Sequence, residues 1–143
     1  MKADNLYSMA LEASISEMEK QWGHIDDSNN GSGIRTDYHH VRVRKNPELT
    51  DDLPPRFGDH QVEYLDDQAL IESYKTLRKE FSVLDVHPVH NDGSRLRIQI
   101  SVSWFKYKNG RSFFGLSDWS DVEFQFDCES QTFVLSAVKL GGI

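Results

Sequence analysis

The sequence predicts a single α+β domain with N-terminal helices packed on an antiparallel β-sheet. Two stretches in the first half carry apolar residues at helical spacing, whereas about sixty residues at the end alternate in the manner of β-strands. Short turn sequences separate these strands. A length of 143 residues fits one domain, so residues 24–33 and 46–61 are expected to be loops inside it.

The first helix is expected from about Lys2 to Trp22. Its apolar residues recur every three or four positions, which aligns them along one face of a helix: Tyr7, Leu11, Ile15, Met18 and Trp22. Gly23 stands where such a helix would end, because glycine readily adopts the conformations that terminate helices. Stripes of this kind usually pack into a core, and we expect this one to do so.

The middle of the chain predicts two strands and a second helix. Alternation of branched or aromatic residues with charged ones indicates a strand over residues 35–45, and a short strand is expected at 62–64. The second helix is expected to begin after Asp66 or Asp67, whose side chains can cap it, and to end near Phe81. Its buried stripe would contain Leu70, Tyr74, Leu77 and Phe81.

Four antiparallel strands are expected in the last part of the chain, over residues 82–89, 94–107, 112–127 and 132–140. The connection Asn109-Gly110 is a strong signal for a two-residue hairpin, because type I′ turns require positive φ at both central positions.

The register of these strands can be checked by asking whether it places the apolar residues on the buried face. Continued from the Asn109-Gly110 turn, a regular ladder would place Asp121 opposite Ile98 on the buried face. We therefore expect a β-bulge within residues 117–121, which pairs Ile98 with Val122 instead. The neighbouring hairpins are expected to form the pairs Val86–Ile98, Leu84–Ile100, Phe126–Phe133 and Val122–Ala137.

One face of this sheet collects the apolar residues, among them Trp104 and Trp119, and both helices are expected to cover it. The opposite face mixes polar with aromatic residues, which is typical of subunit interfaces. We therefore expect a homodimer through this outer face, which would contain Asp85, His87, Arg97, Gln99, Ser101, Ser103, Phe105, Tyr107, Phe114, Glu123, Gln125, Val134 and Val138.

The net charge of −7 is concentrated in one segment. Residues 48–67 contain seven acidic side chains against Arg56 alone, which indicates either a solvated loop or a docking surface. An acidic chain does not suit nucleic-acid binding, which depends on clustered Lys and Arg. No apolar run is long enough to span a membrane, and the N-terminal residues lack the apolar core of a signal peptide, so we expect a cytoplasmic protein without a membrane partner.

The order of these elements resembles that of the nuclear-transport-factor-like, cystatin-like α+β superfamily. The matching segments are the helix DDQALIESYKTLRKEF, the strands RLRIQISVSWFKYKNGR and SFFGLSDWSDVEFQFD, and the terminal FVLSAVKL, and the resemblance covers nearly the whole chain. It implies helices wrapped over a strongly bent sheet, a cystatin-like cone with a pocket at its open end, and dimers formed through the sheet. Two features depart from the superfamily: a single N-terminal helix where many members have two or three, and the long loop 46–61.

Two functions stay open. The resemblance implies either a non-catalytic module that binds a small hydrophobic ligand or a protein, or an isomerase, dehydratase or hydrolase with its active site in the pocket. Such an enzyme needs a carboxylate or histidine base near a neutral donor such as tyrosine. The residues expected at the pocket are Tyr38, His40, Trp104, Asp118 and Trp119, with His39, Asp85 and His87 as further candidates, and no catalytic residue is assigned among them.

No metal ion or other cofactor is expected. The adjacent His39 and His40 would point to opposite faces of a strand, and so would His87 and His90, so neither pair can chelate one ion. The single cysteine, Cys128, excludes an internal disulfide and lies at a predicted turn without a cationic neighbour to activate its thiol.

Overall fold

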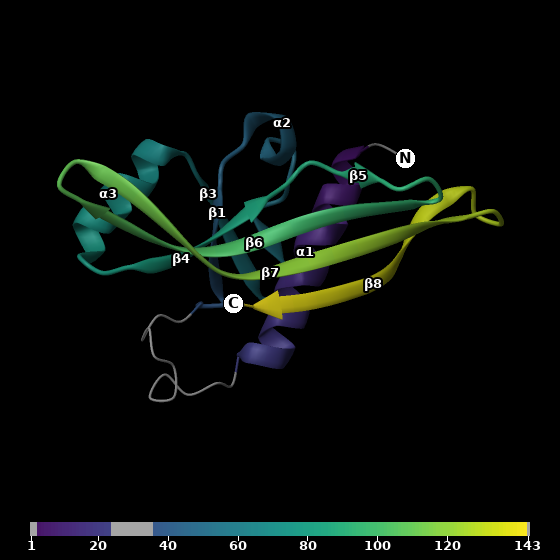
Figure 1. Ribbon diagram of the computed structural model, residues 1–143, viewed down its shortest axis with the longest axis horizontal. Coiled ribbons are helices and arrows are strands. Elements are labelled where there is room, and N and C mark those ends of the chain that lie inside the picture. The colour runs from purple at the N-terminus through teal and green to yellow at the C-terminus, as the bar shows by residue number, and fades with distance from the viewer. Residues whose placement is uncertain (1–2, 24–35, 143) are drawn as a thin grey trace.

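The computed structural model describes residues 3–23 and 36–142, which form a mixed α+β structure built on one large sheet (Figure 1). Within these ranges the elements are three helices and eight strands. The first residue of the predicted N-terminal helix, the predicted loop 24–33 and the start of the predicted strand 35–45 lie outside them.

Helix α1 spans Ala3–Trp22, as its apolar spacing predicts. The predicted stripe is buried except for Trp22, which packs at the margin of the core. Gly23 directly follows the helix, and its backbone N–H donates to the carbonyl of Glu19 at 2.8 Å. A Cβ at this position would lie 2.5 Å from that carbonyl oxygen, which explains why a residue without a side chain stands there.

The last part of the chain forms the antiparallel strands that the sequence predicts: β4 (Phe81–Val86), β6 (Arg95–Lys108), β7 (Arg111–Asp127) and β8 (Thr132–Gly142), with the two-residue β5 (His90–Asn91) beside β6. Asn109 and Gly110 join β6 to β7 with φ angles of 54° and 74°, the positive values that a type I′ turn requires. In Figure 1 these two strands form a long, twisted hairpin that crosses the whole molecule.

The middle of the chain contributes β1 (His40–Arg44), α2 (Pro47–Thr50), β2 (Arg56–Phe57), β3 (His60–Leu65) and α3 (Asp67–Leu77). The strand order is β2-β3-β1-β4-β6-β7-β8. Strand β1 lies parallel to both β3 and β4, so the prediction of an antiparallel sheet is wrong in this part. The expected loop 46–61 likewise contains α2 and β2.

Helix α3 is shorter than the sequence predicts. The carboxylate of Asp66 accepts a hydrogen bond from the Ala69 N–H at 2.8 Å, which confirms the predicted cap. The helix ends at Leu77, because the next residue, Arg78, adopts a left-handed conformation with φ of 56°. Phe81, predicted as the last helical residue, begins β4 instead.

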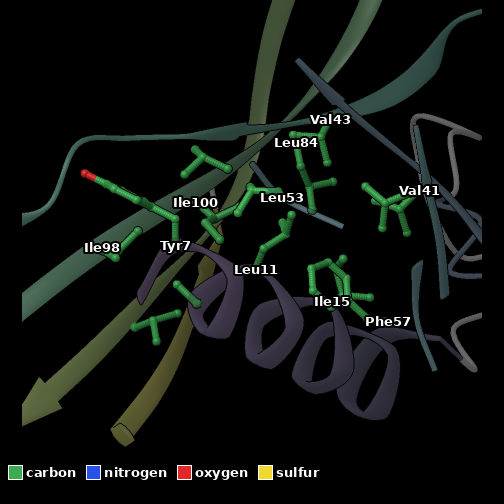
Figure 2. Close-up of a cluster of buried hydrophobic side chains, with 14 of the residues drawn as sticks. Tyr7, Leu11, Ile15, Val41, Val43, Leu53, Phe57, Leu84, Ile98 and Ile100 are labelled. Atoms are coloured by element: carbon green, nitrogen blue, oxygen red, sulfur yellow. The ribbon is translucent and has the colours of Figure 1, made fainter. Parts of the chain in front are cut away.

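The two long helices cover opposite faces of the sheet, although the sequence predicts both on one face. We call these the α1 face and the α3 face. On the α1 face, Leu11 and Ile15 point from α1 toward the strands and belong to one core with Ile100 (Figure 2). On the α3 face a smaller core contains Leu65, Leu70, Phe81, Val83 and Phe105. Phe105 lies on the face opposite α1, as predicted, but it is fully buried under α3, so the expectation that no helix covers this face is wrong.

The direction in which the chain crosses the sheet explains this arrangement. The connection from β1 to β3 moves toward the β2 edge, and the connection from β3 to β4, which contains α3, moves back past β1. Crossovers between parallel strands keep one hand, so two that run in opposite directions lie on opposite faces. Leu53 and Phe57, from the first connection, accordingly join the core on the α1 face.

The ladder between β6 and β7 contains the predicted bulge. Ile98 pairs with Val122, and the register shifts between Val102 and Ser103, where Ser117 is the extra residue of β7. Trp119 therefore pairs with Ser101 rather than with a core residue, and its side chain lies on the α3 face. The prediction that Trp119 belongs to the core face is wrong because the bulge comes before it.

The neighbouring ladders follow the predicted register in part. Phe126 pairs with Phe133 as predicted, but a second irregularity, at Ser136 of β8, matches Val122 with Val138 in place of Ala137. Strand β4 is displaced by two residues and pairs Val86 with Ile100. Because residues two apart share a face, Val86 is still buried as predicted.

Candidate interaction surface on strand β7

The sheet separates the five residues predicted at a pocket into two groups. Tyr38 packs against the core on the α1 face, and Trp104 and Asp118 lie on the same face by their strand register. His40 and Trp119 lie on the α3 face. Their predicted roles in ligand binding stay predictions, but a single pocket cannot contain both groups.

Each of these side chains has a local partner. Nε2 of His40 lies 2.8 Å from the Glu63 carboxylate, and the Ser117 hydroxyl donates to the Asp118 carboxylate at 3.0 Å. The two indole rings lie against glycines of neighbouring strands: a Cβ at Gly115 would come within 2.6 Å of Trp104, and one at Gly141 within 2.5 Å of Trp119. Glycine at these positions makes room for the rings.

One contact resembles a catalytic pair. Nε2 of His87 lies 2.9 Å from the hydroxyl of Ser101 on the α3 face. The carboxylate of Asp85, two residues from His87, lies 3.7 Å from the guanidinium of Arg44. The sequence did not indicate Ser101 as a partner, because the displaced register between β4 and β6 had to be known first.

Side chains from α1 and from the strands pack against each other between the helix and the sheet. Leu11, Ile15, Ile98 and Ile100 have no exposed surface. Figure 2 shows the helix side chains meeting those of the strands and of Leu53 in one cluster. These side chains therefore form one packed core on the α1 face.

Strand β7 extends beyond the strand beside it. Strand β8 reaches back only as far as Asp118, which pairs with Gly142. Over the described ranges of the chain, no strand pairs with residues 111–117 on the side away from β6, and we call this segment the free β7 edge. The predicted strands 112–127 and 132–140 already differ in length, which is the signal that could have indicated this edge.

The free β7 edge carries exposed apolar side chains. Phe113 is 49% exposed, Phe114 37% and Leu116 48%. Phe113 lies on the α1 face, whereas Phe114 and Leu116 lie on the α3 face. Other exposed apolar residues lie at the opposite end of β7 and in β8, where the two strands pair with each other: Phe126, Val134 and Leu135.

Neighbouring groups hold Phe114 in position. The guanidinium carbon of Arg44 lies 4.5 Å from the centre of its ring, and the ring of Phe105 lies 5.2 Å from it in an edge-to-face arrangement. Arg44 is itself held by the Asp67 carboxylate, to which it donates two hydrogen bonds, of 3.1 and 3.2 Å. These contacts restrict the Phe114 side chain, and a side chain that is already restricted loses less entropy on binding.

Two ionisable groups whose pKa values are shifted form hydrogen bonds within the fold. Burial raises the pKa of Tyr64 to about 12, and its hydroxyl donates to the carbonyl of Pro54 at 2.7 Å. The hydroxyl and backbone N–H of Ser130 hold the pKa of the Asp127 carboxyl below its ordinary value, in the turn between β7 and β8.

Among the residues with described positions, no three side chains of His, Cys, Asp or Glu gather in a way that could hold a metal ion. None of the helices within these ranges is long and apolar enough to cross a membrane.

Comparison with known proteins gave one structural likeness. No family model matches the chain, and no curated protein matches it. A solved structure titled as a variant of Rd1NTF2_05 has 15% sequence identity over 96% of this chain and 99% of its own, with a TM-score of 0.29. The function proposed below is therefore based on the geometry of this chain.

Proposed function

We propose that this chain is a non-catalytic protein-binding module that takes up an extended segment of its partner along the free β7 edge. The observation that carries the proposal is the combination, in residues 111–117, of an unpaired strand edge with three exposed apolar side chains. An added strand would satisfy the outward backbone N–H and C=O groups of this edge. Pockets for alternate side chains would then select the sequence of that strand.

The two faces of the edge would select different side chains. On the α1 face, an incoming strand would meet Phe113 and the ring of Trp104. On the α3 face it would meet Phe114 and Leu116. Apolar residues on both faces of the bound strand are therefore expected, since aromatic side chains contribute most where they become fully desolvated.

Membership of the nuclear-transport-factor-like superfamily, with its bent cone, is part of this proposal. The order of a helix, a strand, a second helix and a long meander supports it. The parallel pairing of β1 and the placement of α3 on the far face differ from that meander. The exposed apolar side chains of the free β7 edge support a protein partner over a small hydrophobic ligand.

The test is selection of extended peptides from a displayed random library by the immobilised protein. Enriched peptides should bind the wild type and lose at least tenfold in affinity for Leu116→Lys, because the lysine would be buried against the added strand. Leu135→Lys is the matched control, since Leu135 is 44% exposed but lies on β8. Peptides that bind both variants equally would contradict the proposal.

A second candidate function is hydrolysis by Ser101, with His87 as its base. The 2.9 Å contact between them favours it, because a nucleophile and its base must lie within hydrogen-bond distance. Ser101→Ala should then abolish any turnover of p-nitrophenyl acetate, whereas Ser103→Ala, on the same face of β6, should leave it unchanged. Turnover that survives Ser101→Ala would remove this candidate.

A further inference from the structure

We infer that the strand taken up by the free β7 edge is the same edge of a second copy of this chain. This inference rests on the proposed function and names its partner. The two copies would be related by a two-fold axis perpendicular to the sheet, so that β7 pairs antiparallel with its own copy. The sheet would then run continuously through both molecules.

The free β7 edge can pair with itself in this arrangement. Within the described residues β8 pairs with β7 as far as Asp118, and the hairpin turn ends at Gly110, so residues 111–117 have no described partner on this side. A two-fold axis at Phe114 sets these residues opposite the same residues of the second copy. Such an axis keeps each face of the sheet continuous, since it sets residues from the same face opposite one another.

The side chains of the segment complement themselves in this register. Phe113 lies opposite Gly115 of the second copy, so a large side chain meets a position with none. The Trp104 ring already lies against Gly115, within 2.6 Å of where a Cβ would be, and would meet the incoming Phe113 on the α1 face. On the α3 face the two Phe114 residues lie opposite each other at the axis, and Ser112 lies opposite Leu116. Aromatic pairs on facing strands are among the stabilising cross-strand contacts.

The charges of the two ends are complementary as well. Residues 112–117 carry no charge, so no like charges oppose each other within the pair. Lys108 and Arg111 lie at the turn end of the segment, and Asp118 and Asp121 follow its other end. Antiparallel pairing brings the basic end of each copy to the acidic end of the other, with Arg111 and Asp118 on the same face.

The other outer edges of the sheet carry the features that prevent pairing between copies. Strand β2 has two residues, one of them Arg56. Strand β8 contains Lys139 and the irregularity at Ser136. Short edges, lysines and bulges protect natural sheets from edge-to-edge association, whereas residues 112–117 contain neither a charge nor a proline. Among the described residues, the free β7 edge thus carries fewer of these protective features than β2 or β8.

The first experiment measures mass in solution, by light scattering after gel filtration, over 1 to 300 μM protein. We expect a species of twice the chain mass in the wild type and in Leu135→Lys. Leu116→Lys should weaken the dimer at least tenfold, and circular dichroism should show that it is folded. A chain mass at every wild-type concentration would overturn the inference. Library peptides that still bind the edge would then leave the proposed function standing.

The second experiment locates the axis by cross-linking. In a Cys128→Ser background, which removes the exposed native thiol, Phe114→Cys should form an intermolecular disulfide on mild oxidation, because the two positions face each other. Leu135→Cys should stay unlinked under the same conditions. If the dimer does not cross-link through position 114 but is weakened by Lys139→Glu, its interface lies on the α3 face of the sheet, to which Lys139 belongs, and the inference is overturned.

Discussion

The buried hydrogen bond between α1 and β7 provides a quantitative test of how the N-terminal helix is held. The hydroxyls of Ser14 and Ser120 lie 2.9 Å apart, and neither residue has exposed surface. Replacing one of them with alanine leaves the other hydroxyl buried without this partner, which costs about 1–3 kcal/mol. Ser120→Ala should cost more than Ser14→Ala, because alanine in a helix recovers about 0.5 kcal/mol of propensity.

The double variant distinguishes this bond from general packing. Removing both hydroxyls leaves no unpaired group, so the double variant should be less destabilised than the sum of the single ones, by about 1 kcal/mol or more. Urea unfolding of the four proteins, followed by circular dichroism, measures these free energies. Strictly additive losses would mean that the two hydroxyls do not depend on each other, and would refute the reasoning.

Three further predictions concern local geometry. Gly141→Ala should displace the Trp119 ring, against which its Cβ would lie at 2.5 Å, and should lower stability by about 1–3 kcal/mol and change the tryptophan emission spectrum. Arg78→Gly should raise the melting temperature by about 2–4 °C, because φ of 56° at this helix end suits glycine better than arginine. Burial raises the pKa of Tyr64 from 10.0 to about 12, so the stability that its neutral hydroxyl contributes is complete below pH 10 and is lost as the pH rises toward 12. Urea titrations across this range should therefore show a steeper alkaline loss in wild type than in Tyr64→Phe, and equal slopes would contradict the assignment.

The C-terminal strands could be predicted in detail because their partners are close in the sequence. The Asn109-Gly110 turn sets the register between β6 and β7, and the requirement to bury Val122 makes a bulge necessary. The sequence limits that bulge to residues 117–121 without choosing among them. This choice determines the face of Trp119, which is why its position was wrong while its strand was right.

The parallel part of the sheet could not be derived in this way. Parallel strands are joined by crossovers, which have no turn signal comparable to Asn-Gly. The pairing of β1 with both β3 and β4 therefore has no mark in the sequence of residues 40–44. Without it, the opposite placement of α3 and the burial of Phe105 cannot be anticipated.

The candidate surface was harder to predict than the fold for a physical reason. Tyr38, His40 and Asp118 were predicted because their side chains can take part in catalysis or ligand binding. An unpaired strand edge consists of backbone groups, so no particular residue type marks it in the sequence. Phe113 and Leu116 look like ordinary strand residues until the described pairing of β7 with β8 is seen to reach only to Asp118.

The packing of α1 has a consequence for the way this protein is made. The helix ends at Trp22, and the strands that complete its core run from Arg95 to Gly142. At a synthesis rate of about 5–20 residues per second, several seconds or more separate the synthesis of α1 from that of those strands. Residues 40–86 can therefore pack against α1 first, and the core of the helix is complete only after the strands of the C-terminal part have been made.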